Sequence, residues 1–414
     1  MCAQNYVYIY LLRAFLHVFY YIYSYISLSS SILSLYCAHF YIVFIDFACD
    51  SKILKCLCII SGMNKFDVVK FSKSRANLAG DVLIEKNESI NKVEALTVLS
   101  NWRAAHSYPM HIFKQRLKLV SEKIDKNALS AQRLKRVPSI VKKLGRSYGG
   151  ERATMKLTQM QDIAGCRVVL SSVSAVREIH EKSYGKRDTK HKKVNEKDYI
   201  TYPKEDGYRS IHLVYRYNSD KKADYNGLLV EIQLRSKLQH LWATAVETVD
   251  FFTMQAIKSN EGRKDWVSFF RLVSSAFALL EKCPVVPGTS DNMKELCHLI
   301  KEKEKMLQVR SKMKHWATSI RVFDQIKKKF DDELFLLELD SVQEKLTISS
   351  YSRRNEEKAL RDYAAVEKRI FGNKKYDVVL VGSDSVVDLK KAYPNYFSDT
   401  GEFLKNLDRI LKFC

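Results

Sequence analysis

"LLVEIQLR", residues 228–235, is an apolar run with an acid at its centre. Its alternation predicts a β-strand over 227–236, in which Leu229, Glu231 and Gln233 share one face. A carboxylate inside so apolar a strand is expected to be ion-paired, to lie at a sheet edge or to be functional. Glu231 is therefore the first candidate for a functional residue.

The segments around this strand predict a mixed sheet with helices. A short apolar run indicates a strand over 165–173, and alternation indicates one over 210–218. Residues 174–185 and 237–252 are expected to be helices. The interleaving of strands with helices predicts an α/β domain over about 130–255.

The regions further out are read by the same patterns. Residues 91–145 are expected to be helical, 184–200 to be a basic connector and 260–335 to form lysine-rich helices. Beyond them a small C-terminal α/β unit is expected, with strands over 345–352 and 376–385 and helices over 353–372 and 386–411. The expected division of the chain is 1–62, 63–130, 131–255, 256–335 and 336–414.

The chain has 414 residues, enough for two or more domains, and a formal net charge of +22. That excess favours anionic partners such as nucleotides, RNA or an acidic membrane surface. Residues 1–62 hold five charged residues with a net charge of +1, which leaves +21 for residues 63–414. The basic character therefore belongs to the part of the chain that reads as a globular protein.

Residues 1–62 differ from the rest, with nine of the 23 tyrosines, five of the nine cysteines and no proline. The apolar runs 14–33 and 32–49 are marginal for membrane spans, which need about 20 residues. A signal peptide is the second interpretation, but no short apolar core with a small-residue cleavage site follows a basic start. The third interpretation, which we favour, is upstream AT-rich DNA read as protein, with Met63 as the start. Membrane contact is expected only if residues 1–62 are translated.

The remaining cysteines are Cys166, Cys283, Cys297 and Cys414, and they are scattered, with no C-x-x-C and no Cys/His ligand spacing. This pattern argues against a structural zinc site and fits a reducing compartment, so a cytoplasmic location is expected.

Asp162, in "QMQDIAGCRVVL" (159–170), is the second acidic candidate. It comes just before a predicted strand, where an acid is often only a turn or cap residue. Together with Glu231 on a neighbouring strand, however, it could hold Mg²⁺, which takes carboxylate and phosphate oxygens as ligands.

Basic and aromatic residues that suit a phosphate or nucleotide site follow in order along the chain. The basic ones are Arg133, Lys135, Arg136, Lys142, Lys143, Arg167, Lys197, Lys204 and Arg209. If they converge they can bind several phosphates, although any single lysine is more often a solvated surface residue. Tyr208 could stack on a base or simply pack, and His212 could bind phosphate or be a half-buried core histidine.

The combination resembles the synthetase domain of the RelA/SpoT family, which makes (p)ppGpp alarmones. The motifs that carry the resemblance are "RLKRVPSIVKKL", "DIAGCR", "KDYITYPKEDGYRSIH" and "VEIQLRS…QHLWA", in that order, over about residues 131–250. The resemblance implies a mixed five-stranded sheet flanked by helices and related to nucleotidyltransferases. Ser236 stands where the family usually has threonine, which is a mild departure.

The resemblance also implies roles for single residues. The residues matched to ATP binding are Arg133, Lys135, Arg136, Lys143 and Arg167, with either Arg133 or Arg136 meeting the adenine. Those matched to the acceptor nucleotide are Lys204, Tyr208 and His212, with Tyr208 stacking on the base and Gln233 beside them. Asp162 and Glu231 match the Mg²⁺ ligands and catalytic acids, and Glu231 is matched to the group that activates the acceptor hydroxyl.

The implied activity is transfer of pyrophosphate from ATP to the 3′-hydroxyl of GDP or GTP, with release of AMP. Two alternatives stay open. One is transfer to the 3′ end of tRNA or to adenine nucleotides, which the lysine-rich stretches 186–197, 301–313 and 327–329 would suit. The other is an inactive RNA-binding or regulatory module, against which the presence of both acids argues. No DNA partner is expected, and a homo-oligomer is compatible with the family.

Hydrolysis of (p)ppGpp is not expected. Family members that hydrolyse it carry a domain with a His-Asp pair, and this sequence contains no His-Asp dipeptide. About 65 residues separate Met63 from the synthetase-like region, which is too few for such a domain.

Overall fold

The computed structural model describes residues 67–414, apart from gaps at 149–150, 153, 186–189, 257–260, 320, 325–332, 341–342, 344, 353–354, 372, 374–375 and 384–399. These residues belong to one compact unit, Asn64–Cys414. The interpretations of residues 1–62 lie outside the described part. No helix among the described residues has both the length and the apolar character needed to cross a bilayer.

One nine-stranded mixed sheet organises this unit, with the strand order β5-β6-β7-β4-β1-β11-β9-β10-β8. Its strands, in chain order, are β1 (Leu129–Leu134), β4 (Ala164–Leu170), β5 (Lys192–Asp198), β6 (Ile211–Arg216), β7 (Leu229–Ser236), β8 (Arg321–Asp324), β9 (Glu333–Asp340), β10 (Lys345–Ser352) and β11 (Tyr376–Ser383). β4 with β7 and β10 with β8 are parallel, and the other pairs are antiparallel. A separate two-stranded ribbon joins β2 (Ser147–Tyr148) to β3 (Glu151–Arg152).

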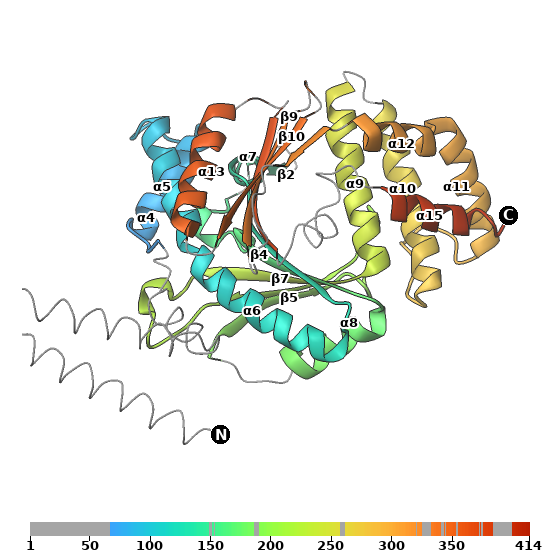
Figure 1. Ribbon diagram of the computed structural model, residues 1–414, viewed down its shortest axis with the longest axis horizontal. Helices are drawn as coiled ribbons and strands as arrows, with labels where there is room; N and C mark the ends of the chain where they lie inside the picture. Colours follow the sequence, from blue (N-terminus) through green and yellow to red (C-terminus); the bar gives the residue numbers. More distant parts are fainter. Residues whose placement is uncertain are drawn as a thin grey trace, which may run out of the picture. The chain divides into compact units, whose positions relative to one another are not determined.

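The helices flank this sheet (Figure 1). Those before and within the first five strands are α4 (Lys73–Leu83), α5 (Lys92–Ala105), α6 (Ser107–Ile124), α7 (Val137–Leu144) and α8 (Val173–Ile179), which continues as a π-helical turn, His180–Gly185. Later come α9 (Lys237–Ala256), α10 (Glu261–Leu280), α11 (Met293–Leu307), α12 (Val309–Ser319), α13 (Glu356–Ile370) and α15 (Gly401–Ile410). Short 3₁₀ turns lie at Leu157–Gln159 and Ala223–Tyr225.

The two faces of the central strands have different surroundings, because successive side chains of a strand point to opposite faces. On β7, Val230, Ile232 and Leu234 belong to the main hydrophobic core, which also takes side chains from α4, α5, α6 and α8. Glu231 and Gln233 point to the opposite face, where α9 contacts β4 and β7. The apolar face thus fixes the register that aims the polar residues into one region.

The C-terminal strands continue the same sheet. β11 pairs antiparallel with β1, with Gln132 opposite Gly382 and Arg133 opposite Val381. A second apolar cluster joins Ala131 of β1 to residues of the C-terminal strands: Phe335, Leu337, Leu339, Leu346, Ile348, Val379 and Val381. On the other face, α13 packs against β9, β10 and β11. The expected mixed sheet flanked by helices is confirmed, and four C-terminal strands extend its first five.

Some elements differ from the sequence-based expectation. The helices expected over 91–145 are interrupted by β1, which is a strand because its backbone pairs with β4 on one side and β11 on the other. The expected connector over 184–200 contains β5, a polar edge strand that carries five charged residues. β8 and β9 were not anticipated. In these cases tertiary pairing overrides the local pattern. Of the helices expected over 386–411, α15 is described, and residues 386–399 lie outside the described part.

A disulfide bond is one further feature that the sequence did not predict. Cys297 of α11 and Cys414 form a disulfide with a Cα–Cα distance of 5.8 Å, although 117 residues separate them in sequence. Cys166 and Cys283 are free thiols, and Cys166 is buried in the main core. Spacing could not predict this pairing, because the fold brings the C-terminus back to α11.

Candidate active site

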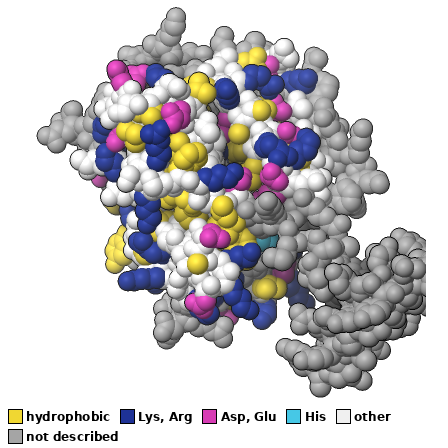
Figure 2. Space-filling view, turned by 90° about the vertical axis from the view of Figure 1, so that its left-hand side faces the viewer, with side chains coloured by type: hydrophobic (Ala, Val, Ile, Leu, Met, Phe, Trp, Pro, Cys, Tyr) yellow, Lys and Arg dark blue, Asp and Glu magenta, His cyan; other side chains and the backbone are white. Residues whose placement is uncertain are grey.

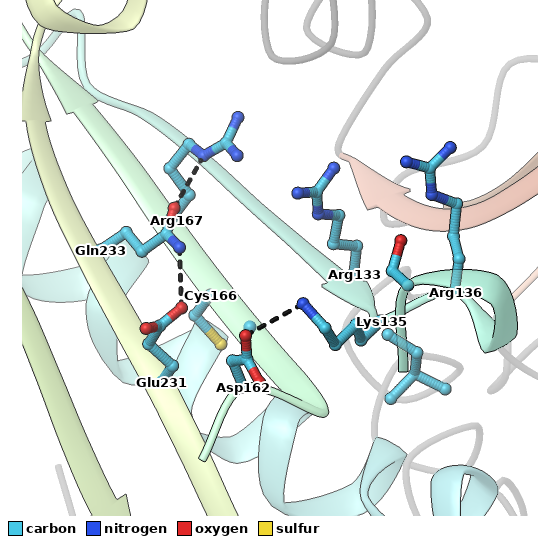
Figure 3. Close-up of a pocket in the computed structure, with 11 residues that line it drawn as sticks. Arg133, Lys135, Arg136, Asp162, Cys166, Arg167, Glu231 and Gln233 are labelled. Carbon is cyan, nitrogen blue, oxygen red and sulfur yellow. Dashed lines mark hydrogen bonds and ion pairs between the residues drawn. The ribbon is translucent and has the colours of Figure 1, made fainter. Parts of the chain in front are cut away.

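A polar pocket of about 100 Å³ opens on the face of the sheet opposite the main core. Its lining comes from β1, the start of α7, β4, β7 and the turn before β4: Arg133, Leu134, Lys135, Arg136, Ser139, Asp162, Gly165, Cys166, Arg167, Glu231 and Gln233. The close-up in Figure 3 shows the guanidinium groups of Arg133, Arg136 and Arg167 reaching to one side and the carboxylates of Asp162 and Glu231 lying at the other.

Sheet register explains why the two acids meet. β4 and β7 are parallel, with Gly165 opposite Glu231 and Arg167 opposite Gln233. Asp162 lies in the turn three residues before Gly165, at the same edge of the sheet. Gly165 has no side chain, so the space in front of Glu231 on this strand stays open. Both acids therefore line one pocket, Glu231 from β7 and Asp162 from the turn before the neighbouring strand β4.

Asp162 is held between two lysines. Lys135 Nζ lies 3.0 Å from its Oδ2, and Lys143 Nζ lies 2.9 Å from its Oδ1. Burial alone would raise the pKa of Asp162, but the two ammonium groups outweigh it and hold the pKa below its ordinary value. The carboxylate is therefore ionised, and two cations lie ready beside it where phosphate oxygens could replace it as their partner.

Glu231 is held by two side-chain donors. Because a carboxylate only accepts, His212 Nδ1 must donate to Glu231 Oε1 at 2.8 Å, and Gln233 Nε2 donates to Oε2 at 2.7 Å. Burial raises the pKa of Glu231, but these hydrogen bonds and the His212 interaction outweigh it and lower the pKa below its ordinary value. Glu231 is thus an ionised, oriented carboxylate facing the pocket.

A closed ring of hydrogen bonds extends from Glu231 to the acceptor loop, which we define as residues 197–212. Arg235 Nη2 donates to the Tyr208 hydroxyl oxygen at 2.7 Å and to Gln233 Oε1 at 3.1 Å. The Tyr208 hydroxyl also lies 2.7 Å from His212 Nε2. The Tyr208 hydroxyl is thus shared between the Arg235 guanidinium and the His212 ring, and it links both to Glu231.

Arg235 is a site residue that the sequence-based reading missed, although the signal was present. It is two residues beyond Gln233 on the same strand, so alternation places it on the same face as Glu231. It is 3% exposed, and its guanidinium carbon lies 5.1 Å from the centre of the Tyr208 ring. Arg235 therefore fixes both the hydroxyl and the ring of Tyr208.

The acceptor loop brings a second aromatic ring to the site. Lys204 Nζ lies 4.8 Å from the ring centre of Tyr199 and 5.2 Å from that of Tyr208. Tyr199 also makes edge contacts with the rings of Tyr208 and His212 at 5.9 and 5.4 Å. The sequence-based reading missed Tyr199, whose position before an irregular turn gave no periodic signal.

The tip of the acceptor loop is anchored on α10. Gly207 has φ of +95°, and a Cβ there would lie 3.0 Å from Ser274 Cβ and from Trp242 Cζ2. Ser274 Oγ donates to the Gly207 carbonyl at 2.6 Å and accepts from Arg209 Nε at 3.0 Å. Only a glycine fits this conformation and this close approach together.

The arginines of the pocket also interact electrostatically with a carboxylate on α9, Glu247. Arg167 Nε donates to Gln233 Oε1 at 3.4 Å. Burial raises the pKa of Glu247 on α9, but the positive charges of Arg133, Arg167 and Arg235 outweigh it and lower the pKa. Glu247 was not anticipated, because in an amphipathic helix an acid reads as solvent-facing.

The predicted site residues fall into two linked groups. Those at the pocket itself are Arg133, Lys135, Arg136, Lys143, Asp162, Arg167, Glu231 and Gln233. Lys204, Tyr208 and His212 belong to the acceptor loop and reach the pocket through the bond from His212 to Glu231. Lys197 lies opposite His212 in the pairing of β5 with β6, and Lys142 is not among the residues that line the pocket. The roles assigned to all of these residues stay predictions.

The donor set suits a hard cation. Asp162 and Glu231 supply carboxylate oxygens to the same pocket. Among the described residues, no group of three or more His, Cys, Asp or Glu side chains is arranged to hold a metal. A two-carboxylate site completed by phosphate oxygens and water fits Mg²⁺, which is commonly bound in that way, and does not fit zinc.

Comparison with known proteins gives one family. Residues 132–250 match a sequence family described as "Region found in RelA / SpoT proteins". Over 119 residues the chain is 34% identical to the GTP pyrophosphokinase YjbM of Bacillus subtilis, covering 29% of this chain and 54% of that protein. Over 115 residues it is 36% identical to the GTP pyrophosphokinase YwaC of the same organism, covering 27% and 52%. The chain thus spans about half the length of these relatives.

Among solved structures, small alarmone synthetase 1 of Bacillus subtilis bound to its product pppGpp is similar at 24% identity and a TM-score of 0.37. The similarity covers 46% of this chain and 94% of that one. Small alarmone synthetase 2 of the same organism is similar at 20% identity and a TM-score of 0.34, covering 51% and 97%.

Proposed function

Residues 132–250 are a RelA/SpoT-type region, homologous to small alarmone synthetases, and from this premise we propose that the chain is a pyrophosphotransferase. It transfers the β,γ-pyrophosphate of ATP to the 3′-hydroxyl of GDP or GTP and releases AMP. The observation that carries the proposal is the meeting of Asp162 and Glu231 in one pocket whose opposite side is lined by Arg133, Arg136 and Arg167.

The arginine and lysine side of the pocket is the proposed donor site. ATP carries most of its charge on the phosphates, and guanidinium and ammonium groups bind phosphate through charge-assisted hydrogen bonds. Lys135 and Lys143 already bracket one anion, the Asp162 carboxylate. Planar guanidinium groups can also stack on an adenine ring, which suits Arg133, Arg136 or Arg167.

The acceptor loop is the proposed guanine-nucleotide site. Lys204 brings positive charge over the Tyr199 and Tyr208 rings, and Tyr208 stays half-buried beside His212. Stacking of a base on Tyr208 is compatible with its bonded hydroxyl, since stacking uses the ring face. The ring of hydrogen bonds through His212 then connects the acceptor site to Glu231.

In the proposed reaction, the acceptor 3′-oxygen attacks the β-phosphorus of ATP. A new P–O bond forms, the bond between the β-phosphorus and the α,β-bridging oxygen breaks, and AMP leaves. Glu231 accepts the hydroxyl proton. Its lowered pKa keeps it ionised before the reaction, and its two hydrogen bonds hold it in one orientation.

Mg²⁺ held by Asp162 and Glu231 would neutralise charge that develops on the transferring phosphates. Lys135 and Lys143 share that task from the protein side, because each ammonium is already within 3.0 Å of Asp162. Arg167 and Gln233 fix the far oxygen of Glu231 through one continuous chain of hydrogen bonds.

The charge of the chain does not by itself select tRNA as the acceptor. On the face shown in Figure 2, the Lys and Arg side chains of the described residues lie scattered among acidic and apolar ones. A nucleic-acid-binding surface is more often a continuous basic stripe. GDP or GTP therefore remains the proposed acceptor, with tRNA as an outcome of the test.

The test is transfer of label from γ-labelled ATP by the full chain, with GDP, GTP, ATP or bulk tRNA as the acceptor. We expect label in guanosine tetra- or pentaphosphate, and a loss of about 10²-fold or more in Glu231→Gln. Glu196→Gln is the matched control, because Glu196 makes surface ion pairs on β5 with His180 and Lys193. Label on tRNA alone, or full activity in Glu231→Gln, contradicts the proposal.

A further inference from the structure

The C-terminal strands contact the element that carries the proposed donor site. β11 lies beside β1, and its Asp377 forms an ion pair with Arg136, 241 residues earlier in the chain. Arg136 is the residue before the first turn of α7, and it lines the pocket. The site is therefore bordered by a residue from outside the 132–250 region that defines the family match.

The ion pair between Arg136 and Asp377 is partly exposed, so we expect it to affect ligand binding more than folding. The Arg136 side chain is 35% exposed and that of Asp377 is 19% exposed. Ion pairs at this level of exposure contribute little to the stability of the fold. The contact between β1 and β11 is already secured by strand pairing and by the apolar cluster around Ala131 and Val381.

The geometry points to a role in orientation. An arginine on a chain of four rotatable bonds loses substantial rotamer freedom when it binds a phosphate or stacks on a base. A carboxylate paired with the guanidinium of Arg136 removes part of that freedom in advance and presents the group to the pocket in one orientation.

We propose that Asp377 is a positioning residue of the donor-nucleotide site, contributed by the C-terminal strand β11 and acting through Arg136. This inference rests on the proposed function. It gives the C-terminal extension a part in ATP binding, in addition to its part in the sheet.

The experiment compares Asp377→Ala with Glu338→Ala in the full chain. Glu338 of β9 is the matched control because it also pairs with an arginine, Arg369. Glu338 is the strand partner of Val378, so it points to the face of the sheet away from Asp377. Binding of a nonhydrolysable ATP analogue, measured by calorimetry, is the first readout. Steady-state KM and kcat for ATP and for GDP are the second.

We expect Asp377→Ala to weaken analogue binding and raise the KM for ATP about two- to fivefold, the range for a partly exposed pair. The kcat, the KM for GDP and the melting temperature stay at the native values, and Asp377→Glu restores ATP binding. In an Arg136→Ala background, Asp377→Ala has no further effect, because Asp377 acts through Arg136.

Three results overturn the inference. One is native affinity in Asp377→Ala. Another is tighter binding, which would mean that Asp377 competes with the nucleotide for Arg136. The third is an equal loss in the Arg136→Ala background. Failure of the native chain to bind the ATP analogue would instead contradict the proposed function, so the two failures are distinguishable.

Discussion

The proposed donor side and the proposed acceptor side of the pocket are held in place by different means. The donor elements β1 and α7 are braced by carboxylates from the C-terminal unit: Asp377 pairs with Arg136, and Glu367 Oε1 accepts from the Val137 N–H at 2.9 Å. The tip of the acceptor loop is braced by α10, where Ser274 bonds the carbonyl of Gly207. One brace is charged and comes from more than 200 residues away, whereas the other is close packing against a glycine.

This difference predicts different sensitivities. A buried carboxylate that serves two partners cannot be removed without leaving a buried charge unpaired. A glycine contact fails when a single Cβ is added. Substitutions on the donor side should therefore act on folding and ATP binding, and those on the acceptor side on GDP or GTP binding.

The largest effect is expected from Glu367→Gln. Glu367 and Arg103 form an ion pair in which the side chains are 5% and 3% exposed, and Glu367 also caps the start of α7. Loss of the negative charge strands the Arg103 guanidinium in the core, at a cost of about 3–5 kcal/mol in the free energy of unfolding. Urea denaturation measures it, with Glu338→Gln as the control. A change below about 1 kcal/mol, the range of an exposed pair, would refute the buried brace.

The next effect is expected from Gly207→Ala. Its φ of +95° and the 3.0 Å approach to Ser274 and Trp242 leave no room for a Cβ. We expect a loss of about 1–3 kcal/mol in stability and a higher KM for GDP, with unchanged ATP-analogue binding. Gly227→Ala is the control, because Gly227 has φ of +90° but only Lys73 Nζ nearby, at 3.9 Å. Equal effects at both glycines would show that backbone strain alone matters.

A smaller effect of about 1–2 kcal/mol is expected from Ser274→Ala. The variant removes the donor to the Gly207 carbonyl and the acceptor of Arg209 Nε, both buried. Thermal denaturation and the KM for GDP measure the result. If the KM for ATP rises instead of the KM for GDP, the assignment of α10 to the acceptor side is wrong.

The smallest effect is a pH dependence at Glu231, where the two sides meet. Because the folded pKa of Glu231 lies below its ordinary value of 4.5, its ionised form stabilises the fold at higher pH. That contribution is full above the unfolded pKa and is lost as the pH falls through the folded pKa. The native chain should therefore lose stability relative to Glu231→Gln as the pH is lowered from about 5. Parallel stability curves for the two chains would contradict the hydrogen-bonded carboxylate.

The part of the fold built on local pattern was predictable. Alternation placed β4, β6 and β7, and it aimed Glu231 and Gln233 at one face. The same alternation places Arg235 on the face of Glu231 and Gln233, although Arg235 was not predicted to be a site residue. The proximity of Asp162 and Glu231 follows from the pairing of two neighbouring strands, β4 and β7.

The rest depends on pairings that local pattern does not contain. β1 is a strand because β4 and β11 flank it, and β11 comes more than 240 residues later. Asp377 and Glu367 read as ordinary surface acids in sequence, and only the returning C-terminal strands bring them to Arg136 and Val137. The hydroxyl bonds of Tyr208 to Arg235 and His212 likewise appear only in three dimensions.

The central claim is that this pocket transfers pyrophosphate from ATP to a guanine nucleotide. The most direct measurement is ³¹P NMR of the products that the full chain forms from ATP, GDP and Mg²⁺. The account predicts equal amounts of AMP and of a guanosine nucleotide with a diphosphate on its 3′-oxygen. Formation of ADP, or of AMP with free pyrophosphate and unchanged GDP, would contradict it.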